Sequence, residues 1–134
     1  MWGLSNLSVR LAEVGRYKEA LTAIEEAIDR FLPVAMDTAA DQHVLADFAT
    51  KRSLYLGELG GREEGLAAIE EAVRLWRRLV ATDPALEPGL AAALHNLSAD
   101  LAKAQRHKEA LATIEEAVRL WRRELLSNVV DDMA

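Results

Sequence analysis

Residues 4–27 read LSNLSVRLAEVGRYKEALTAIEEA, and residues 94–117 read LHNLSADLAKAQRHKEALATIEEA. A third copy, ATKRSLYLGELGGREEGLAAIEEA at 49–72, keeps the second half of that line and changes the first half. Matching residues such as Ile24, Ile69 and Ile114 recur in steps of 45. Three copies at one fixed period indicate a repeat architecture. One such unit cannot bury its own apolar face, so we expect the copies to stack and complete a shared core.

Each copy contains two helical patterns. In the second pattern of the middle copy, apolar residues recur at spacings of three and four, which is one face of a helix: Leu66, Ile69, Val73, Trp76 and Val80. A neighbouring stripe of small and apolar residues broadens this face, as expected for a helix that packs on two neighbours. The sequence therefore predicts six helices, at about 2–14, 17–32, 37–59, 62–81, 86–104 and 107–127.

The first helix of each copy ends at a turn. Gly15 and Gly60 suit the left-handed residue that closes a helix, and Gln105 takes that position with some strain in the last copy. The serines at the same step, Ser8, Ser53 and Ser98, indicate packing rather than nucleophilic catalysis, because catalysis needs one serine and not three.

Composition narrows the class of protein. The 134 residues suit one domain. The absence of cysteine fits a reducing cytoplasm, where we expect the protein to reside. A net charge of -6 argues against nucleic acid as a partner. No window resembles a membrane span or a signal peptide.

Catalytic and ligand-binding patterns are also missing. GELGG at 57–61 is interpreted as a helix end rather than a phosphate-binding loop. His43 and Asp47 lie four residues apart, which indicates a surface contact more than a metal site. We expect no cofactor, no metal and no enzymatic activity.

The pattern resembles the tetratricopeptide repeat family over essentially the whole chain. Small residues stand at the family's small positions, and leucines stand at its first-helix core positions: Ser8, Ser53, Ser98; Ala20, Gly65, Ala110; Ala27, Ala72, Ala117; Leu4, Leu7, Leu11; and Leu94, Leu97, Leu101. The unit is longer than the common form and resembles the extended units of kinesin light chains and of many bacterial regulatory proteins.

This resemblance implies an all-α fold of three tandem antiparallel helix hairpins, stacked as a right-handed α-solenoid. It implies one domain, 1–134, with repeats at about 1–34, 35–81 and 82–126 and a short C-terminal tail at 127–134. First helices line a concave groove and second helices form the outer wall. The implied function is a non-catalytic scaffold that binds a peptide or protein segment in the groove. The alternative is a structural or oligomerisation segment of a larger regulatory protein with no dedicated ligand.

The candidate groove residues follow the first helices, where the family presents an asparagine to a peptide backbone and basic residues to carboxylates. They are Asn6, Arg10, Lys51, Tyr55, Asn96, Asp100 and Lys103. The middle copy departs from the pattern, because Lys51 replaces the asparagine and Arg52 replaces the leucine of the other two copies. Two interpretations of Arg52 stay open: a first helix that starts near Asp37 or Thr38 and is rotated, or an arginine whose stem snorkels along the core.

The last helix predicts self-association. Repeat arrays need polar capping units, yet Leu111, Val118 and Leu125 match the residues of the middle copy that face the next unit. We expect a homo-oligomer formed through these uncapped ends. In the rival prediction, Val129, Val130 and Met133 fold back as a cap.

Overall fold

The computed structural model describes residues 2–32 and 39–133. They form six α-helices and one 3-10 turn, which are α1 (Trp2–Glu13), α2 (Tyr17–Phe31), α3 (Ala39–Glu58), α4 (Arg62–Thr82), η1 (Pro84–Leu86), α5 (Glu87–Lys103) and α6 (His107–Met133). The six predicted helices are confirmed. The predicted start of α3 at 37 and the boundary between the first two repeats lie outside the described residues.

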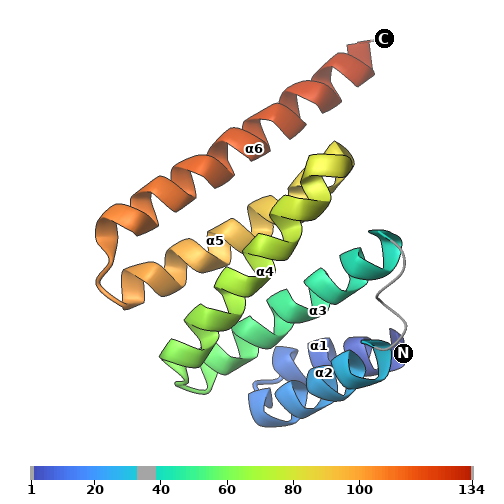
Figure 1. Ribbon diagram of the computed structural model, residues 1–134, viewed down its shortest axis with the longest axis vertical. Coiled ribbons are helices and arrows are strands. Elements are labelled where there is room, and N and C mark those ends of the chain that lie inside the picture. The colour runs from blue at the N-terminus through green and yellow to red at the C-terminus, as the bar shows by residue number, and fades with distance from the viewer. Residues whose placement is uncertain (1, 33–38, 134) are drawn as a thin grey trace.

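The helices pair as three antiparallel hairpins, α1–α2, α3–α4 and α5–α6, which follow one another along the length of the molecule (Figure 1). The second helix of each hairpin also packs against the first helix of the next one, α2 on α3 and α4 on α5. The described residues contain no strand. The predicted all-α stack of hairpins is confirmed.

Two apolar clusters hold the stack together. One joins the first hairpin to α3, with Ile24, Phe31 and Phe48 at its centre. The other joins α3, α4, α5 and α6 around Ile69 and Trp76. The family's later small position, Ala27, Ala72 and Ala117, is fully buried in all three hairpins. A side chain no larger than a methyl group lets the helix backbones approach closely there.

The repeat step is visible in the buried serines. Ser8, Ser53 and Ser98 each donate a hydrogen bond of 2.7 Å to the backbone carbonyl three residues earlier. A buried hydroxyl needs such a partner, since an unsatisfied one is costly. Their packing role, predicted from periodicity, agrees with this arrangement.

The turns inside the hairpins also follow the prediction. Gly15, Gly60 and Gln105 all have positive φ, at 80°, 85° and 64°. Glycine adopts this region freely, whereas a residue with a Cβ atom is strained there. The third turn therefore stores strain that the first two avoid.

The predicted C-terminal tail needs correction. Residues 127–133 continue α6 without a break, and α6 extends past the ends of the other helices (Figure 1). Val129, Val130 and Met133 remain exposed, so the rival prediction that they fold back as a cap is wrong. No glycine or proline interrupts residues 124–130, so the helix propagates, because each added residue forms one more backbone hydrogen bond.

Candidate peptide-binding surface

Three of the predicted groove residues meet at one place. Asn96, Asp100 and Lys103, from successive turns of α5, line a hollow of about 200 Å³ together with the end of α3. α3 contributes Gly57 and Glu58 to it. Because Gly57 has no side chain, its backbone lies open beside α5, and an added Cβ would come within 3.9 Å of the Asp100 carboxylate.

An adjoining hollow of about 270 Å³ extends this site toward the α3–α4 turn. Its charges are balanced, with Glu58 and Asp100 opposite in sign to Arg62 and Lys103. Burial raises the pKa of the Asp100 carboxyl, nearby Lys103 opposes that rise, and Glu58 adds to it. The combined surface offers amide, carboxylate and ammonium groups side by side, which is suited to the alternating donors and acceptors of a peptide backbone.

Lys51 lies outside these hollows and has partners of its own. Its Nζ donates to Asp47 Oδ2 at 2.6 Å and to Ser5 Oγ at 3.3 Å. The second bond ties α3 to α1. Two of the three N–H donors of Lys51 are thus engaged within the protein, so Lys51 serves the contact between neighbouring hairpins in this structure.

The predicted residues of α1 stand apart as well. Asn6 and Arg10 are exposed, and Arg10 Nη1 donates to Glu13 of its own helix at 3.3 Å. The hollow that contains Asn96 does not include them. The structure thus brings together the candidates of the third repeat and separates them from those of the first.

The prediction that Tyr55 contacts a peptide is wrong. Its side chain is only 2 % exposed. Its hydroxyl lies 3.2 Å from Ser8 Oγ, and its ring lies 6.5 Å from that of Tyr17. The ring fills the space between the first two hairpins, where the aligned Arg10 and Asp100 have no equivalent apolar bulk.

A groove on the other side of the stack was missed. Its volume is about 500 Å³, and it lies between α2 and α4 with α3 as its floor. Arg52 lines this groove, with Nε 3.4 Å from Glu25 Oε2 across it. Its half-buried stem and paired head agree with the snorkelling interpretation. The signal in the sequence was the leucine-to-arginine change itself.

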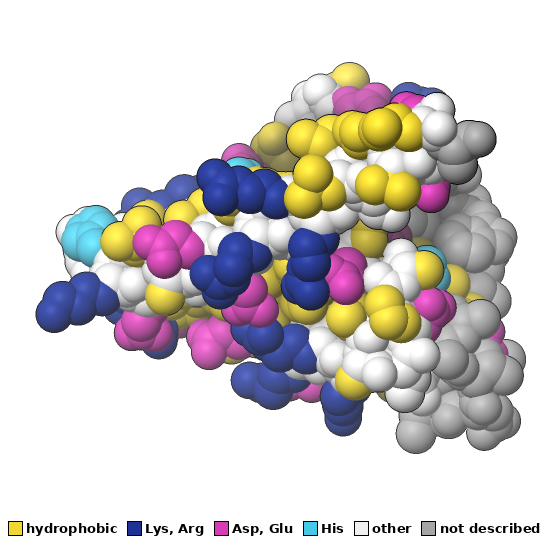
Figure 2. All heavy atoms as spheres, turned by 90° about the horizontal axis from the view of Figure 1, so that it is seen from above, with side chains coloured by type: hydrophobic (Ala, Val, Ile, Leu, Met, Phe, Trp, Pro, Cys, Tyr) yellow, Lys and Arg dark blue, Asp and Glu magenta, His cyan; other side chains and the backbone are white. Residues whose placement is uncertain are grey.

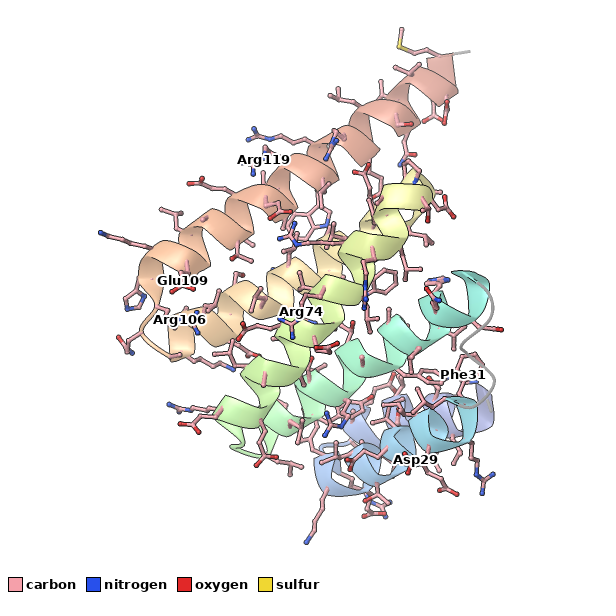
Figure 3. All side chains as sticks on the ribbon, viewed as in Figure 1. Asp29, Phe31, Arg74, Arg106, Glu109 and Arg119 are labelled. Atoms are coloured by element: carbon pink, nitrogen blue, oxygen red, sulfur yellow. The ribbon has the colours of Figure 1, made fainter. Side chains whose placement is uncertain are left out.

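The equivalent space between α4 and α6 is bridged. Arg77 donates two hydrogen bonds to Glu116, at 2.7 and 3.0 Å. Leu32 stands one repeat earlier in the place of Arg77, so α2 and α4 lack this bridge. Another ion pair between helices joins Arg123 of α6 to Glu87 of α5 at 3.5 Å. Other pairs are local, as for Arg106 and Glu109, which lie together at the α5–α6 turn (Figure 3).

The far face of α6 carries exposed apolar side chains. Leu111 and Leu125 are exposed and Val118 is half-buried. Seen from the side of α6, hydrophobic side chains gather in patches between charged ones (Figure 2). Trp121 is 40 % exposed, and its ring lies beside that of His95, with ring centroids 5.9 Å apart.

Stacked hairpins with a shared core and exposed side chains on their first helices define an α-helical repeat scaffold. A tetratricopeptide repeat model matches residues 1–31 and 90–128, just over half of the chain. The chain belongs to the tetratricopeptide repeat family. Residues 34–83 match a different model, that of anaphase-promoting complex subunit 5, and this segment is the copy whose first half departs from the other two. A comparison with curated proteins gives no match.

The extended, kinesin-light-chain-like form of the unit stays a prediction. No helix in the described ranges is both long enough and apolar enough to cross a membrane. Within residues 2–32 and 39–133, no three His, Asp or Glu side chains converge in a way that would hold a metal ion.

Proposed function

We propose that the chain is a non-catalytic interaction module that binds a peptide or protein segment along its first helices. The observation that carries the proposal is the hollow formed by Asn96, Asp100 and Lys103 of α5 with Gly57 and Glu58 of α3. Tetratricopeptide repeats generally mediate contacts between proteins, and this chain belongs to that family.

The chemistry of the hollow favours a backbone ligand over a terminal carboxylate. Asn96 offers one acceptor and two donor positions. The open backbone of Gly57 lies beside it, and the cations are matched by Glu58 and Asp100. A free carboxylate would have to compete with both acids, and Lys51 is already paired with Asp47. A segment with both a basic and an acidic side chain suits these charges best.

A peptide selected from a random display library on the immobilised chain provides the test. Isothermal titration should show that Asn96→Ala weakens its binding by about 0.5–1.5 kcal/mol, the usual net worth of one hydrogen bond. Asn6→Ala is the matched control, because Asn6 has the same repeat position but lies outside the hollow. Equal effects of the two changes, or none, would show that the hollow is not the binding surface.

A second candidate function is favoured by the far face of α6. We infer that the chain also associates with itself through Leu111, Val118 and Leu125, two of which are exposed. Burying such side chains releases about 1.5–3 kcal/mol each as an upper value. This function suits a structural or oligomerisation segment, and it requires no peptide ligand.

A further inference from the structure

Two helices of this protein share ten consecutive residues. IEEAVRLWRR occupies 69–78 in α4 and 114–123 in α6. In α4, Val73 and Trp76 are buried against α5 in the larger apolar cluster. In α6 the equivalent Val118 is half-buried and Trp121 is 40 % exposed, and the described residues place no further helix over them. The α4 surface that packs against α5 inside the molecule is therefore repeated on α6, where it lies at the end of the stack.

The α5 surface that contacts α4, called the receiving surface, is repeated on α1, at the opposite end of the stack. Leu94 and Leu97 of α5 lie in the apolar cluster that contains α4, and Leu97 and Leu101 line a hollow with Glu70 of α4. The matching positions of α1 hold leucine again, at Leu4, Leu7 and Leu11. There they line a hollow of about 430 Å³ with Ala23 and polar residues of α2. Leu7 is 49 % exposed, whereas Leu97 is half-buried under α4.

The middle repeat does not share this receiving surface. It has Ala49 and Arg52 where α1 and α5 have leucine. The contact between α4 and the third hairpin is thus the one that α6 and the first hairpin are equipped to reproduce. The contact between α2 and α3 is of a different kind.

Charges at the rim follow the same register. Arg77 of α4 is bridged to Glu116 of α6 by two hydrogen bonds. The residue equivalent to Arg77 one repeat later is Arg122, and the residue equivalent to Glu116 two repeats earlier is Glu26. Glu70 and Arg106 line one hollow, and their counterparts are Glu115 and Arg16. The equivalent residues keep the same charges, so a contact between two molecules would contain both opposite-charge pairs of the internal contact.

We propose that the partner of the α6 face is the α1–α2 end of a second copy, so that molecules stack head to tail and continue the solenoid. This proposal rests on the self-association inferred above and specifies its two surfaces. Arg122 of one copy then bridges Glu26 of the next. The two surfaces differ, so the contact is heterologous and each added copy leaves a free end. The expected product is a concentration-dependent series of chains rather than a closed dimer.

Two exposed leucines, one on each surface, allow a direct test by sedimentation velocity from about 1 to about 200 µM, a range that covers micromolar affinities. Leu7→Glu disables the receiving end and Leu111→Glu disables the α6 end. Leu7 is 49 % and Leu111 59 % exposed, and circular dichroism checks that the helices persist. Each variant alone should remain monomeric, with at least about tenfold weaker association.

The mixture of these variants decides the geometry. Leu7→Glu keeps an intact α6 face and Leu111→Glu keeps an intact receiving end, so an equimolar mixture should form dimers and stop there. Unchanged association of Leu7→Glu alone would overturn the head-to-tail proposal and leave self-association through α6 alone. A wild-type chain that is monomeric at every concentration would overturn both. Peptide binding at Asn96 is measured separately and survives either outcome.

A charge exchange tests the register. Arg122→Glu and Glu26→Arg should each associate about three- to tenfold more weakly than wild type, the usual range for a partly exposed ion pair. In a mixture, each junction between unlike variants pairs opposite charges, so alternating chains should form and association should recover. Failure to recover would overturn the proposed register.

Discussion

Trp76 and Trp121 stand at the same place in the same ten-residue stretch, yet one is 3 % exposed and the other 40 %. Trp76 donates from Nε1 to Thr50 Oγ1 at 3.1 Å and packs against the backbone of α5 at Gly89. Trp121 meets His95, which occupies the repeat position of Thr50, and has open space on its other side.

This difference shows that the exposed fraction of a repeat residue depends on the helices packed against it and not on the sequence of its own helix. Both helices bury their small residue, Ala72 or Ala117, completely, because that contact is made within the hairpin. Positions that face the next hairpin differ in burial, as Val73 and Trp76 are buried whereas Val118 is half-buried and Trp121 is exposed. The stability of a repeat protein is the sum of the stability of each hairpin and of the contacts between neighbouring hairpins. Trp76 lies in such a contact, whereas Trp121 does not, so comparing the two separates these contributions.

The largest expected effect comes from truncating the two tryptophans in turn. Trp76→Ala removes a fully packed ring and should lower the free energy of unfolding by about 3–5 kcal/mol. Trp121→Ala should cost clearly less, about 1 kcal/mol, because less apolar area returns to water. Urea denaturation followed by circular dichroism measures both. Similar losses would mean that Trp121 is covered in solution, as the head-to-tail contact requires at high concentration, so the measurement is repeated at low micromolar protein.

Gly89 gives the next largest effect, through the same tryptophan. A Cβ at this position would lie 2.4 Å from two ring carbons of Trp76, so Gly89→Ala should destabilise the fold by about 1–3 kcal/mol through overpacking. Gly3→Ala is the control, since nothing lies within 4 Å of its added Cβ. That change should be neutral or slightly stabilising, because alanine favours a helix. If Gly89→Ala were also neutral, the close contact between α5 and Trp76 would be in error.

The sequence predicted the helices and their pairing because those depend on periodicity within the chain. It also predicted the strain at Gln105, since the aligned glycines revealed the backbone that the position needs. It did not predict the site equally well. Asn6 and Asn96 share a repeat position, but only Asn96 has Gly57 and Glu58 beside it. Tyr55 lies on the expected face of α3 and is nevertheless buried. Its burial depends on the side chains of α1 and α2 that pack against it, and the pattern within one helix does not contain them.

Gln105 provides the third prediction and compares the turns of the second and third hairpins. Gln105→Gly should raise the free energy of unfolding by about 1 kcal/mol, because glycine removes the steric cost of a positive φ. The reciprocal change Gly60→Ala should lower it by a similar amount, since the same backbone then carries a Cβ. Thermal and urea unfolding of both variants check the signs. Two changes of the same sign would show that the turns are not equivalent.

The smallest effect concerns the position shared by Arg10, Tyr55 and Asp100, which is exposed in the first repeat, buried in the second and half-buried in the third. Burial raises the pKa of the Asp100 carboxyl above 3.8. The folded chain therefore binds this proton more tightly than the unfolded chain does.

The stability contributed by protonated Asp100 is fully present below the pKa of this group in the unfolded chain. It is lost as the pH rises through the pKa of this group in the folded chain. At about pH 7 the carboxylate is ionised and its desolvation opposes folding, so Asp100→Asn should raise the melting temperature by about 1–2 °C, a small shift because the group is partly solvated. Well below the unfolded pKa, at about pH 2–3, the carboxyl group is protonated in the folded and in the unfolded chain alike, and the difference between variant and wild type should vanish. Asp47→Asn, which removes an acid already paired with Lys51, should act in the opposite direction at neutral pH. A gain from Asp100→Asn that persisted unchanged in acid would mean that packing, and not the buried charge, separates the third repeat from the first.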